Sequence, residues 1–195
     1  MESSKVHLVS SEADLKACMD VRREVFIKEQ NVEEEMEVDG LDDVCTHFAA
    51  TLNDQIVGTC RLRHLGPFVK LERMAVLTQG RGKGVGKALC VAAFKHAAES
   101  SPQLLLMAHA QTAVVGFYSS LGMTIVSDVF YEAGIPHQTM VMVPAADKIA
   151  ALAIWNESIA DSGDRGGFGD ECDDATVIEN IKNVLKEHMK VQEEN

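Results

Sequence analysis

The segment RGKGVG, residues 81–86, constrains the fold more than any other part of this chain. It lies between an apolar run typical of a strand, VKLERMAVL, and an apolar run typical of a helix, KALCVAAFKHAA. Its glycines carry no Cβ, so the backbone can approach a ligand closely. A helix N-terminus presents unpaired N–H groups and the positive end of a dipole, which together favour an anion. The segment therefore predicts a strand–turn–helix unit that binds a phosphate group.

Counting along this turn excludes two common nucleotide motifs. A Walker A loop, G-x-x-x-x-G-K-[ST], fails because its first position is Arg81 and its last is Ala88. A dinucleotide motif, G-x-G-x-x-G, fails because the sixth residue is Val85 or Lys87, depending on the first glycine chosen. The phosphate is therefore expected on a different kind of ligand.

The pattern that does fit the turn is [RQ]-x-x-G-x-[GA], with Arg81, Gly84 and Gly86. In this position it resembles the pyrophosphate-binding turn of the GNAT acetyltransferases, which hold acetyl-coenzyme A (acetyl-CoA). The resemblance covers about residues 5–144 and extends to the ElaA-like branch, which is related to glyphosate N-acetyltransferase and more distantly to glucosamine-phosphate N-acetyltransferase. The blocks that carry it occur in the expected order: VRREVFIKEQN, EVDGLDD, LERMAV, AHAQTAVVGFYSSLGM and EAGIPHQTMVM.

This resemblance implies a mixed α/β fold, in which a mostly antiparallel central sheet carries helices on both faces. We expect that domain to span residues 1–145. Residues 146–195 depart from the compact family domain and are expected to form an acidic, helical C-terminal extension with a Gly/Asp-rich linker. Eleven acidic and four basic side chains lie in residues 151–195, so this region carries most of the net charge of −12.

Local patterns predict the individual elements of the domain. A strand at 5–9 precedes a helix capped by Ser10 or Ser11, and KEQNVEEEMEVDGLDD is expected to be a loop. Asn53-Asp54 predicts a hairpin between two strands. The remaining prediction is a strand at 69–77, a helix to about Glu99, the strand QLLLMAHA, a helix over 113–120, and the strands MTIVSDVF and HQTMVMV.

The extension contains two candidate helices. AADKIAALAIW is one, and a capping box of Thr176 and Glu179 predicts the start of the other. The second helix has one apolar face, which we expect to pack on its own domain or on a neighbouring subunit in a homodimer. The residues of this face are Val177, Ile178, Ile181, Val184, Leu185 and Met189.

Composition limits the partners of the chain. A net charge of −12 argues against nucleic acid and anionic membranes as partners, because both require a cationic surface. The start MESSKVHLVS has no apolar segment of a signal peptide, and the five cysteines contain no C-x-x-C pair. We therefore expect a cytoplasmic protein with reduced thiols. His47, His64, His96 and His109 show no metal-ligand spacing, so no metal is expected.

The resemblance implies that acetyl-CoA is the co-substrate and indicates which residues would contact each part of it. Backbone N–H groups of the strand before the turn would hold the thioester carbonyl, and the turn would hold the pyrophosphate. Gln111 would face the pantetheine arm, and Tyr118 would lie beside the sulfur. The expected cofactor-binding residues are Met74, Ala75, Val76, Arg81, Gly82, Lys83, Gly84, Val85, Gly86, Lys87, Gln111 and Tyr118.

Three side chains are candidates for proton transfer. Tyr118 resembles the family's general acid, although a tyrosine on a helix can also be a core aromatic. His137, in GIPHQTM, resembles a histidine that acts as base and substrate contact, and the alternative is a turn histidine bonded to backbone. Glu72 is a second candidate for the base or for a partner of a substrate ammonium group, and the alternative is a solvated strand residue.

Arginines near these positions are candidates for binding the acceptor. Arg22 matches an arginine that faces a substrate anion in relatives, and Arg73 is a nearby alternative. The resulting functional hypothesis is direct transfer of acetyl from acetyl-CoA to a primary amine of a small metabolite, such as an amino sugar, an amino sugar phosphate or an amino acid. A protein lysine or N-terminal acetyltransferase is the first alternative. A non-catalytic acyl-CoA-binding sensor or interaction module is the second.

Overall fold

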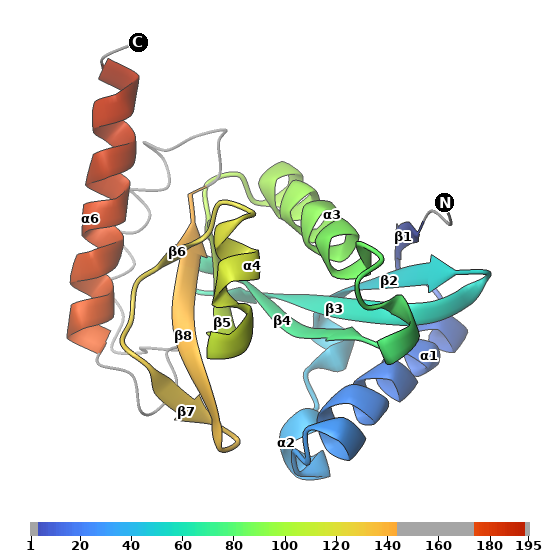
Figure 1. Cartoon of the computed structure of the whole chain (residues 1–195). Helices are drawn as coiled ribbons and strands as arrows, with labels where there is room; N and C mark the ends of the chain where they lie inside the picture. Colours follow the sequence, from blue (N-terminus) through green and yellow to red (C-terminus); the bar gives the residue numbers. More distant parts are fainter. Residues whose placement is uncertain (1–3, 144–173, 194–195) are drawn as a thin grey trace. The chain divides into compact units, whose positions relative to one another are not determined.

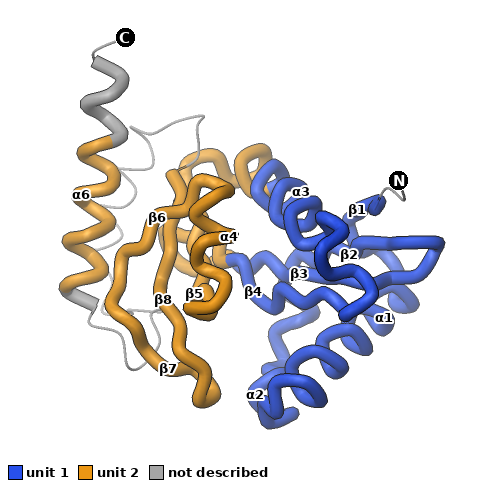
Figure 2. Tube along the Cα trace, viewed as in Figure 1, with its two compact units in different colours: residues 1–63, 71–96 blue, residues 64–70, 97–195 orange. Residues whose placement is uncertain are grey.

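The computed structural model describes residues 4–143 and 174–193 (Figure 1). These residues divide into two compact units (Figure 2). Unit 1 consists of residues 1–63 and 71–96, and unit 2 of residues 64–70 and 97–195. The described residues form a mixed α/β fold with eight strands, and the paired strands are mostly antiparallel.

The strands of unit 1 follow the chain order β1-β2-β3-β4. Asn53 and Asp54 join β2 to β3, and both have positive φ angles, 49° and 60°, as a two-residue hairpin turn requires. The predicted hairpin is therefore confirmed, and so are the first strand and the strand before the glycine turn. The bounds are Lys5–Leu8 for β1, Thr46–Leu52 for β2, Gln55–Leu65 for β3 and Phe68–Val76 for β4.

Two long helices belong to unit 1. Helix α1, Glu12–Arg22, is capped by Ser11, whose side chain accepts a hydrogen bond from the Asp14 N–H at 3.1 Å. It continues into a π-helix, η1, at Arg23–Glu29. Helix α3, Val85–Ser100, ends within a residue of the prediction, and its first twelve residues belong to unit 1. In Figure 1, α1 and α3 lie on opposite faces of the strands of this unit.

Gly58 on β3 allows α3 to approach the sheet. A Cβ built on Gly58 would lie 2.9 Å from Val85 Cγ1 and 3.1 Å from Leu89 Cδ1, both on α3. Contacts this short would push the first turns of the helix away from the strand. The glycine therefore fixes the place of the helix N-terminus in unit 1.

The loop predicted for KEQNVEEEMEVDGLDD is wrong in part. This segment contains a single helical turn, α2, at Glu34–Glu37, and a 3-10 turn, η2, at Asp42–Val44. One of its acidic side chains, Glu37, is buried in an ion pair with Arg22. This tertiary contact orders a segment whose local sequence indicates only a turn-rich loop.

Unit 2 is built around two antiparallel strands, β5 at Leu105–Gln111 and β8 at Ile135–Met142. Two short strands, β6 at Thr124–Ile125 and β7 at Phe130–Glu132, also pair with β8. The first residues of β4 belong to this unit, where the Leu105 N–H donates to Pro67 O at 3.1 Å. The predicted helix over 113–120 is a 3-10 turn, η4 at Thr112–Val114, followed by α4 at Val115–Ser119.

The single strand predicted over MTIVSDVF is wrong, because β6 and β7 are separate. Between them, the Ser127 hydroxyl accepts a hydrogen bond from the Thr139 N–H at 2.7 Å. Asn180 Nδ2 donates to Val126 O at 2.9 Å. These side-chain bonds, together with the backbone bond from the Val126 N–H to Thr139 O at 2.9 Å, hold the segment between the two strands.

The C-terminal helix α6, Asp174–Glu193, packs on unit 2. It begins at Asp174, two residues before the predicted start at Thr176, and the capping box of Thr176 and Glu179 stays a prediction. Its apolar face joins a core cluster with Phe68, Leu105 and Val141, to which it contributes the buried residues Val177, Ile181 and Leu185. Of the two expected alternatives, its own domain or a neighbouring subunit, the structure shows this face packed on its own chain.

Some predictions concern parts of the chain that the structure does not describe. The helix AADKIAALAIW and the Gly/Asp-rich linker lie outside the described residues, and so does the side chain of Met189. A domain boundary at residue 145 stays a prediction. Among the described residues, no helix is both long and apolar enough to cross a membrane.

Candidate active site

The glycine turn follows β4 in unit 1, through a 3-10 turn at Thr78–Gly80. Gly82 and Gly84 have φ angles of 71° and 79°, which other residues adopt only with strain. A Cβ built on either glycine would meet no heavy atom within 4 Å, so the space beside both is open. The first hydrogen bond of α3 runs from the Ala88 N–H to Gly84 O at 2.9 Å, and the preceding N–H groups have no partner within the helix. This arrangement suits an anion.

Arg81 fastens the turn to the rest of unit 1. Its Nε donates to Val76 O at 2.9 Å, and its Nη2 lies 2.5 Å from Glu29 Oε2. The side chain is 47% exposed. The guanidinium group therefore ties the turn to the end of β4 and to η1, and its predicted contact with a ligand stays a prediction.

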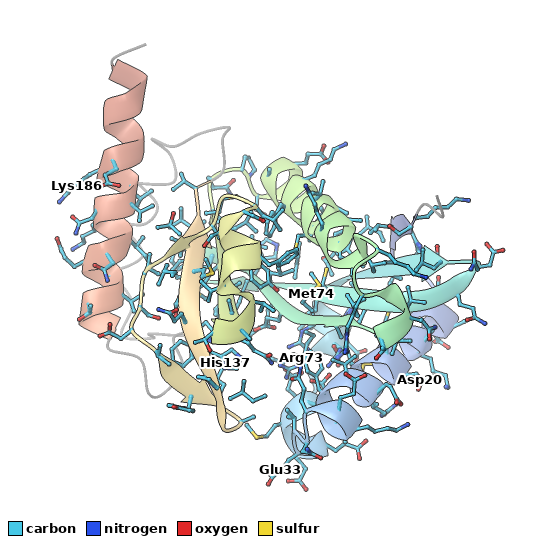
Figure 3. All side chains as sticks on the ribbon, viewed as in Figure 1. Asp20, Glu33, Arg73, Met74, His137 and Lys186 are labelled. Carbon is cyan, nitrogen blue, oxygen red and sulfur yellow. The ribbon has the colours of Figure 1, made fainter. Side chains whose placement is uncertain are left out.

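A positive φ angle kinks strand β4 at Arg73, immediately before Met74. Both residues are labelled in Figure 3. Arg73 has a φ of 52°, and in the described strands it is the only non-glycine residue with a positive φ. Met74, Ala75 and Val76, which are predicted to hold the thioester, follow the kink directly. The Leu77 N–H then donates to Val57 O at 2.8 Å, which returns the chain to β3.

Glu72 lies between two guanidinium groups of β3. Arg61 Nη2 donates to Glu72 Oε2 at 2.8 Å, and Arg63 Nη2 donates to Glu72 Oε1 at 2.8 Å. A carboxylate that accepts charge-assisted bonds on both oxygens is stabilised in its ionised form. This geometry favours a role for Glu72 in ion pairing within unit 1 over a role as general base.

Arg22 does not face an open site. Its side chain is 1% exposed and pairs with Glu37 Oε1. Its Nη1 donates to Asp42 Oδ1 at 2.6 Å, and its Nη2 donates to Glu37 O at 3.0 Å. These contacts argue against the expected contact of Arg22 with a substrate anion, because the guanidinium group is bonded to the buried Glu37 and the partly buried Asp42 of its own unit.

Tyr118 and His137 both lie in unit 2, on α4 and β8. Tyr118 is buried and makes an edge contact with Phe117, with ring centroids 5.1 Å apart. His137 is also buried, and its Nδ1 lies 2.8 Å from Ile135 O. A proton on Nδ1 would serve this carbonyl and leave the lone pair of Nε2 as the acceptor. Gln111 lies directly opposite His137 in the β5–β8 register, so both side chains are on one face.

A second polar group, around the His109 side chain on this face, was not predicted from the sequence. His109 Nδ1 lies 3.2 Å from Glu132 Oε2 and 3.3 Å from Lys70 Nζ. Burial lowers the pKa of His109. Burial acts to raise the pKa of Glu132, but the hydrogen bond with His109 and the charges of His109 and Lys70 together bring this pKa down to about 2. The two-residue spacing of His109 and Gln111 on one strand was the only local signal, because Lys70 and Glu132 come from distant parts of the sequence.

The candidate residues are thus gathered in two groups. Unit 1 holds the glycine turn, the kinked strand with Glu72 and Arg73, and the buried Arg22. Unit 2 holds Gln111, Tyr118 and His137. Among the residues that the structure describes, no cluster of three His, Cys, Asp or Glu side chains could hold a metal ion.

Comparison with known proteins matches residues 9–144 to the family model described as acetyltransferase (GNAT) domain. The chain belongs to the GNAT acetyltransferase family. It is 38% identical over 137 residues to the uncharacterised N-acetyltransferase YjcF of Bacillus subtilis, an alignment that covers 70% of this chain and 97% of YjcF. The resemblance to the ElaA-like branch and the prediction of a mixed α/β fold are confirmed.

Two solved structures show the same relationship. The crystal structure of Escherichia coli ElaA matches with a TM-score of 0.64 and 26% identity, covering 71% of this chain and 99% of ElaA. An acyl-CoA N-acyltransferase from Pseudomonas aeruginosa matches with a TM-score of 0.64 and 29% identity, covering 72% of this chain and 99% of that one. The chain is therefore an enzyme of the acyltransferase class, and its family uses acetyl-CoA or another acyl-CoA as co-substrate.

Proposed function

We propose that this chain transfers acetyl from acetyl-CoA to a primary amine of a small metabolite, of the amino sugar, amino sugar phosphate or amino acid type. The observation that carries the proposal is the turn at 81–86. Its two left-handed glycines open onto free space, and it stands at the N-terminus of α3, where a pyrophosphate is favoured. The acyl-CoA co-substrate is inferred from membership of the GNAT family.

In the proposed reaction, the amine nitrogen attacks the thioester carbonyl carbon directly. A C–N bond forms, the C–S bond breaks, and coenzyme A (CoA) leaves as a thiolate. Backbone N–H groups of Met74–Val76 stabilise the oxygen on which negative charge develops. The substrate ammonium gives one proton to the base before attack. The leaving thiolate takes a proton from the Tyr118 hydroxyl, and the second proton lost by the amine nitrogen as the amide forms restores that hydroxyl.

The contacts within each unit support His137 over Glu72 as the base. With its Nδ1 beside Ile135 O, His137 has Nε2 as the imidazole nitrogen that can accept a proton. The carboxylate of Glu72 already accepts hydrogen bonds from Arg61 and Arg63. Glu72 then stabilises β4 by pairing with β3.

Amine-dependent release of thiol from acetyl-CoA tests this proposal. The purified chain is assayed against amino sugars, amino sugar phosphates, amino acids and a lysine-containing peptide. Faster thiol release with a small amine supports the proposal. Release with the peptide alone would favour a protein acetyltransferase. Binding of CoA with no release for any amine would favour an acyl-CoA-binding module.

A further inference from the structure

The kink of β4 requires an explanation, because the residue with the positive φ angle is an arginine and not a glycine. A positive φ brings the Cβ of an L-residue close to backbone oxygen, and glycine is the usual residue there. The other non-glycine residues with positive φ in the described chain lie in loops and turns, outside the strands. Arg73 alone adopts this conformation inside a strand, so contacts of its side chain must stabilise it.

Those contacts are all made to residues in and just after α2. Arg73 Nη2 donates to Met36 O at 2.9 Å and to Asp39 Oδ2 at 3.1 Å. Arg73 Nε lies 3.0 Å from Glu37 Oε2. Glu37 and Asp39, named here the acidic clamp, therefore hold the guanidinium group from two sides.

The acidic clamp is itself fixed by two buried arginines. Arg22 pairs with the other oxygen of Glu37. Arg61 binds both oxygens of Asp39, at 2.9 Å and 2.6 Å. Burial acts to raise the pKa of Asp39, but the hydrogen bonds from Arg61 and from the Leu41 N–H hold it well below its ordinary value. Asp39 is therefore charged, and its contacts with Arg61 and the Leu41 N–H hold it in one orientation independently of Arg73.

We propose that Glu37 and Asp39 are positioning residues of the acyl-transfer reaction. By holding the Arg73 side chain, they keep the kink of β4 and so direct the backbone N–H groups of Met74–Val76. This inference rests on the proposed function, in which those N–H groups stabilise the thioester oxygen. The acidic clamp itself touches no substrate. It also gives a physical role to the segment EVDGLDD, which the proposed reaction does not otherwise use.

Two variants of Arg73 separate this role from a direct contact with substrate. Arg73→Gly and Arg73→Ala both remove the guanidinium group. Glycine adopts the left-handed conformation freely, whereas alanine does not. If the side chain serves the kink, Arg73→Gly has a kcat for thiol release at least tenfold above that of Arg73→Ala, because small displacements of reacting groups have large effects on rate. Equal values for the two variants would overturn the proposal.

A double-mutant cycle tests whether Asp39 acts through Arg73. Asp39→Asn is expected to lower kcat about tenfold in the native background and less than twofold in the Arg73→Gly background. The KM for acetyl-CoA should change less than twofold, since the turn at 81–86 is untouched. Glu35→Gln, which alters an exposed acid of α2, is the matched control and should keep native kcat. The same loss in both backgrounds would contradict the proposal.

Hydrogen exchange keeps this test separate from the proposed function. Amides of residues 71–77 should exchange about tenfold faster in Asp39→Asn than in Glu35→Gln, with or without catalysis. If the native enzyme releases no thiol with any amine, the proposed function is wrong and exchange alone decides about the acidic clamp. Unchanged exchange in Asp39→Asn would overturn the role of the clamp even in an active enzyme.

Discussion

Truncation of Ile181 tests whether α6 is an integral part of unit 2. Ile181 is 0% exposed and belongs to a core cluster with Phe68 and Leu105. Replacing a fully buried isoleucine by alanine removes apolar contacts and leaves a cavity, which typically lowers the free energy of unfolding by about 2–5 kcal/mol. Burial of Val177, Ile181 and Leu185 together contributes about 5–9 kcal/mol, at about 1.5–3 kcal/mol each. That range is comparable to the whole stability of a domain.

The assay is thermal unfolding of Ile181→Ala beside Asn183→Ala, which changes an exposed residue of the same helix. For a chain of this size, a loss of about 3 kcal/mol lowers Tm by roughly 6–12 °C. Asn183→Ala should remain within about 2 °C of the native chain. If Ile181→Ala and Asn183→Ala have the same Tm, Ile181 is not buried in the core cluster in solution and α6 does not pack on unit 2.

Three further predictions concern proton transfer and pH. Tyr118→Phe should lower kcat at least tenfold, because the hydroxyl acts only as the thiolate develops. The affinity for CoA, measured by calorimetry, should change little. An unchanged kcat would mean that water is the general acid. His137→Gln should abolish the acidic limb of the kcat/KM profile, whereas Glu72→Gln should lower Tm and keep that limb; the opposite result would make Glu72 the base. Burial lowers the pKa of His109 below 6.5, so the unfolded chain binds the proton more readily and the free energy of unfolding falls as pH drops below about 6.5. Denaturant unfolding between pH 7.5 and 5.5 measures this change. The free energy of unfolding should depend less on pH in His109→Gln than in the native chain, and equal pH dependence would exclude this histidine as the cause.

Sequence patterns sufficed where the cause of a structure is local. The hairpin at Asn53-Asp54 follows from two residues that tolerate positive φ between apolar runs. The strand–turn–helix unit follows from Gly82 and Gly84, placed where apolar spacing changes from strand-like to helical. These units have the same geometry in many folds, so neighbouring residues are enough to predict them.

Structure that depends on distant partners was missed. The turn α2 and the 3-10 turn η2 are ordered by arginines of α1 and β3, which lie far from them in sequence. The break between β6 and β7 depends on Thr139 and Asn180, one on β8 and the other on α6. An isolated acidic or polar segment gives no sign of such partners.

The candidate site shows the same division. The backbone conformation of the turn at 81–86 could be predicted, because glycine is the usual residue where φ is positive. The kink at Arg73 could not, because LERMAV contains no glycine and reads as a regular strand. Arg22 was expected to bind substrate because it matches an arginine of relatives, and its ion pairs with Glu37 and Asp42 could not be predicted from the local sequence.

Calorimetric titration of CoA into Gly84→Asp tests the central claim most directly. The substitution adds a side chain and a negative charge at a residue with a φ of 79° and open space beside it. Gly66→Asp is the matched control, because Gly66 also has a positive φ, 54°, and open space, but lies in the turn between β3 and β4. If the turn at 81–86 holds the pyrophosphate, Gly84→Asp weakens CoA binding at least 100-fold, which corresponds to about 2.7 kcal/mol, and Gly66→Asp binds like the native chain. Native affinity in Gly84→Asp would contradict the assignment of this turn as the acyl-CoA site.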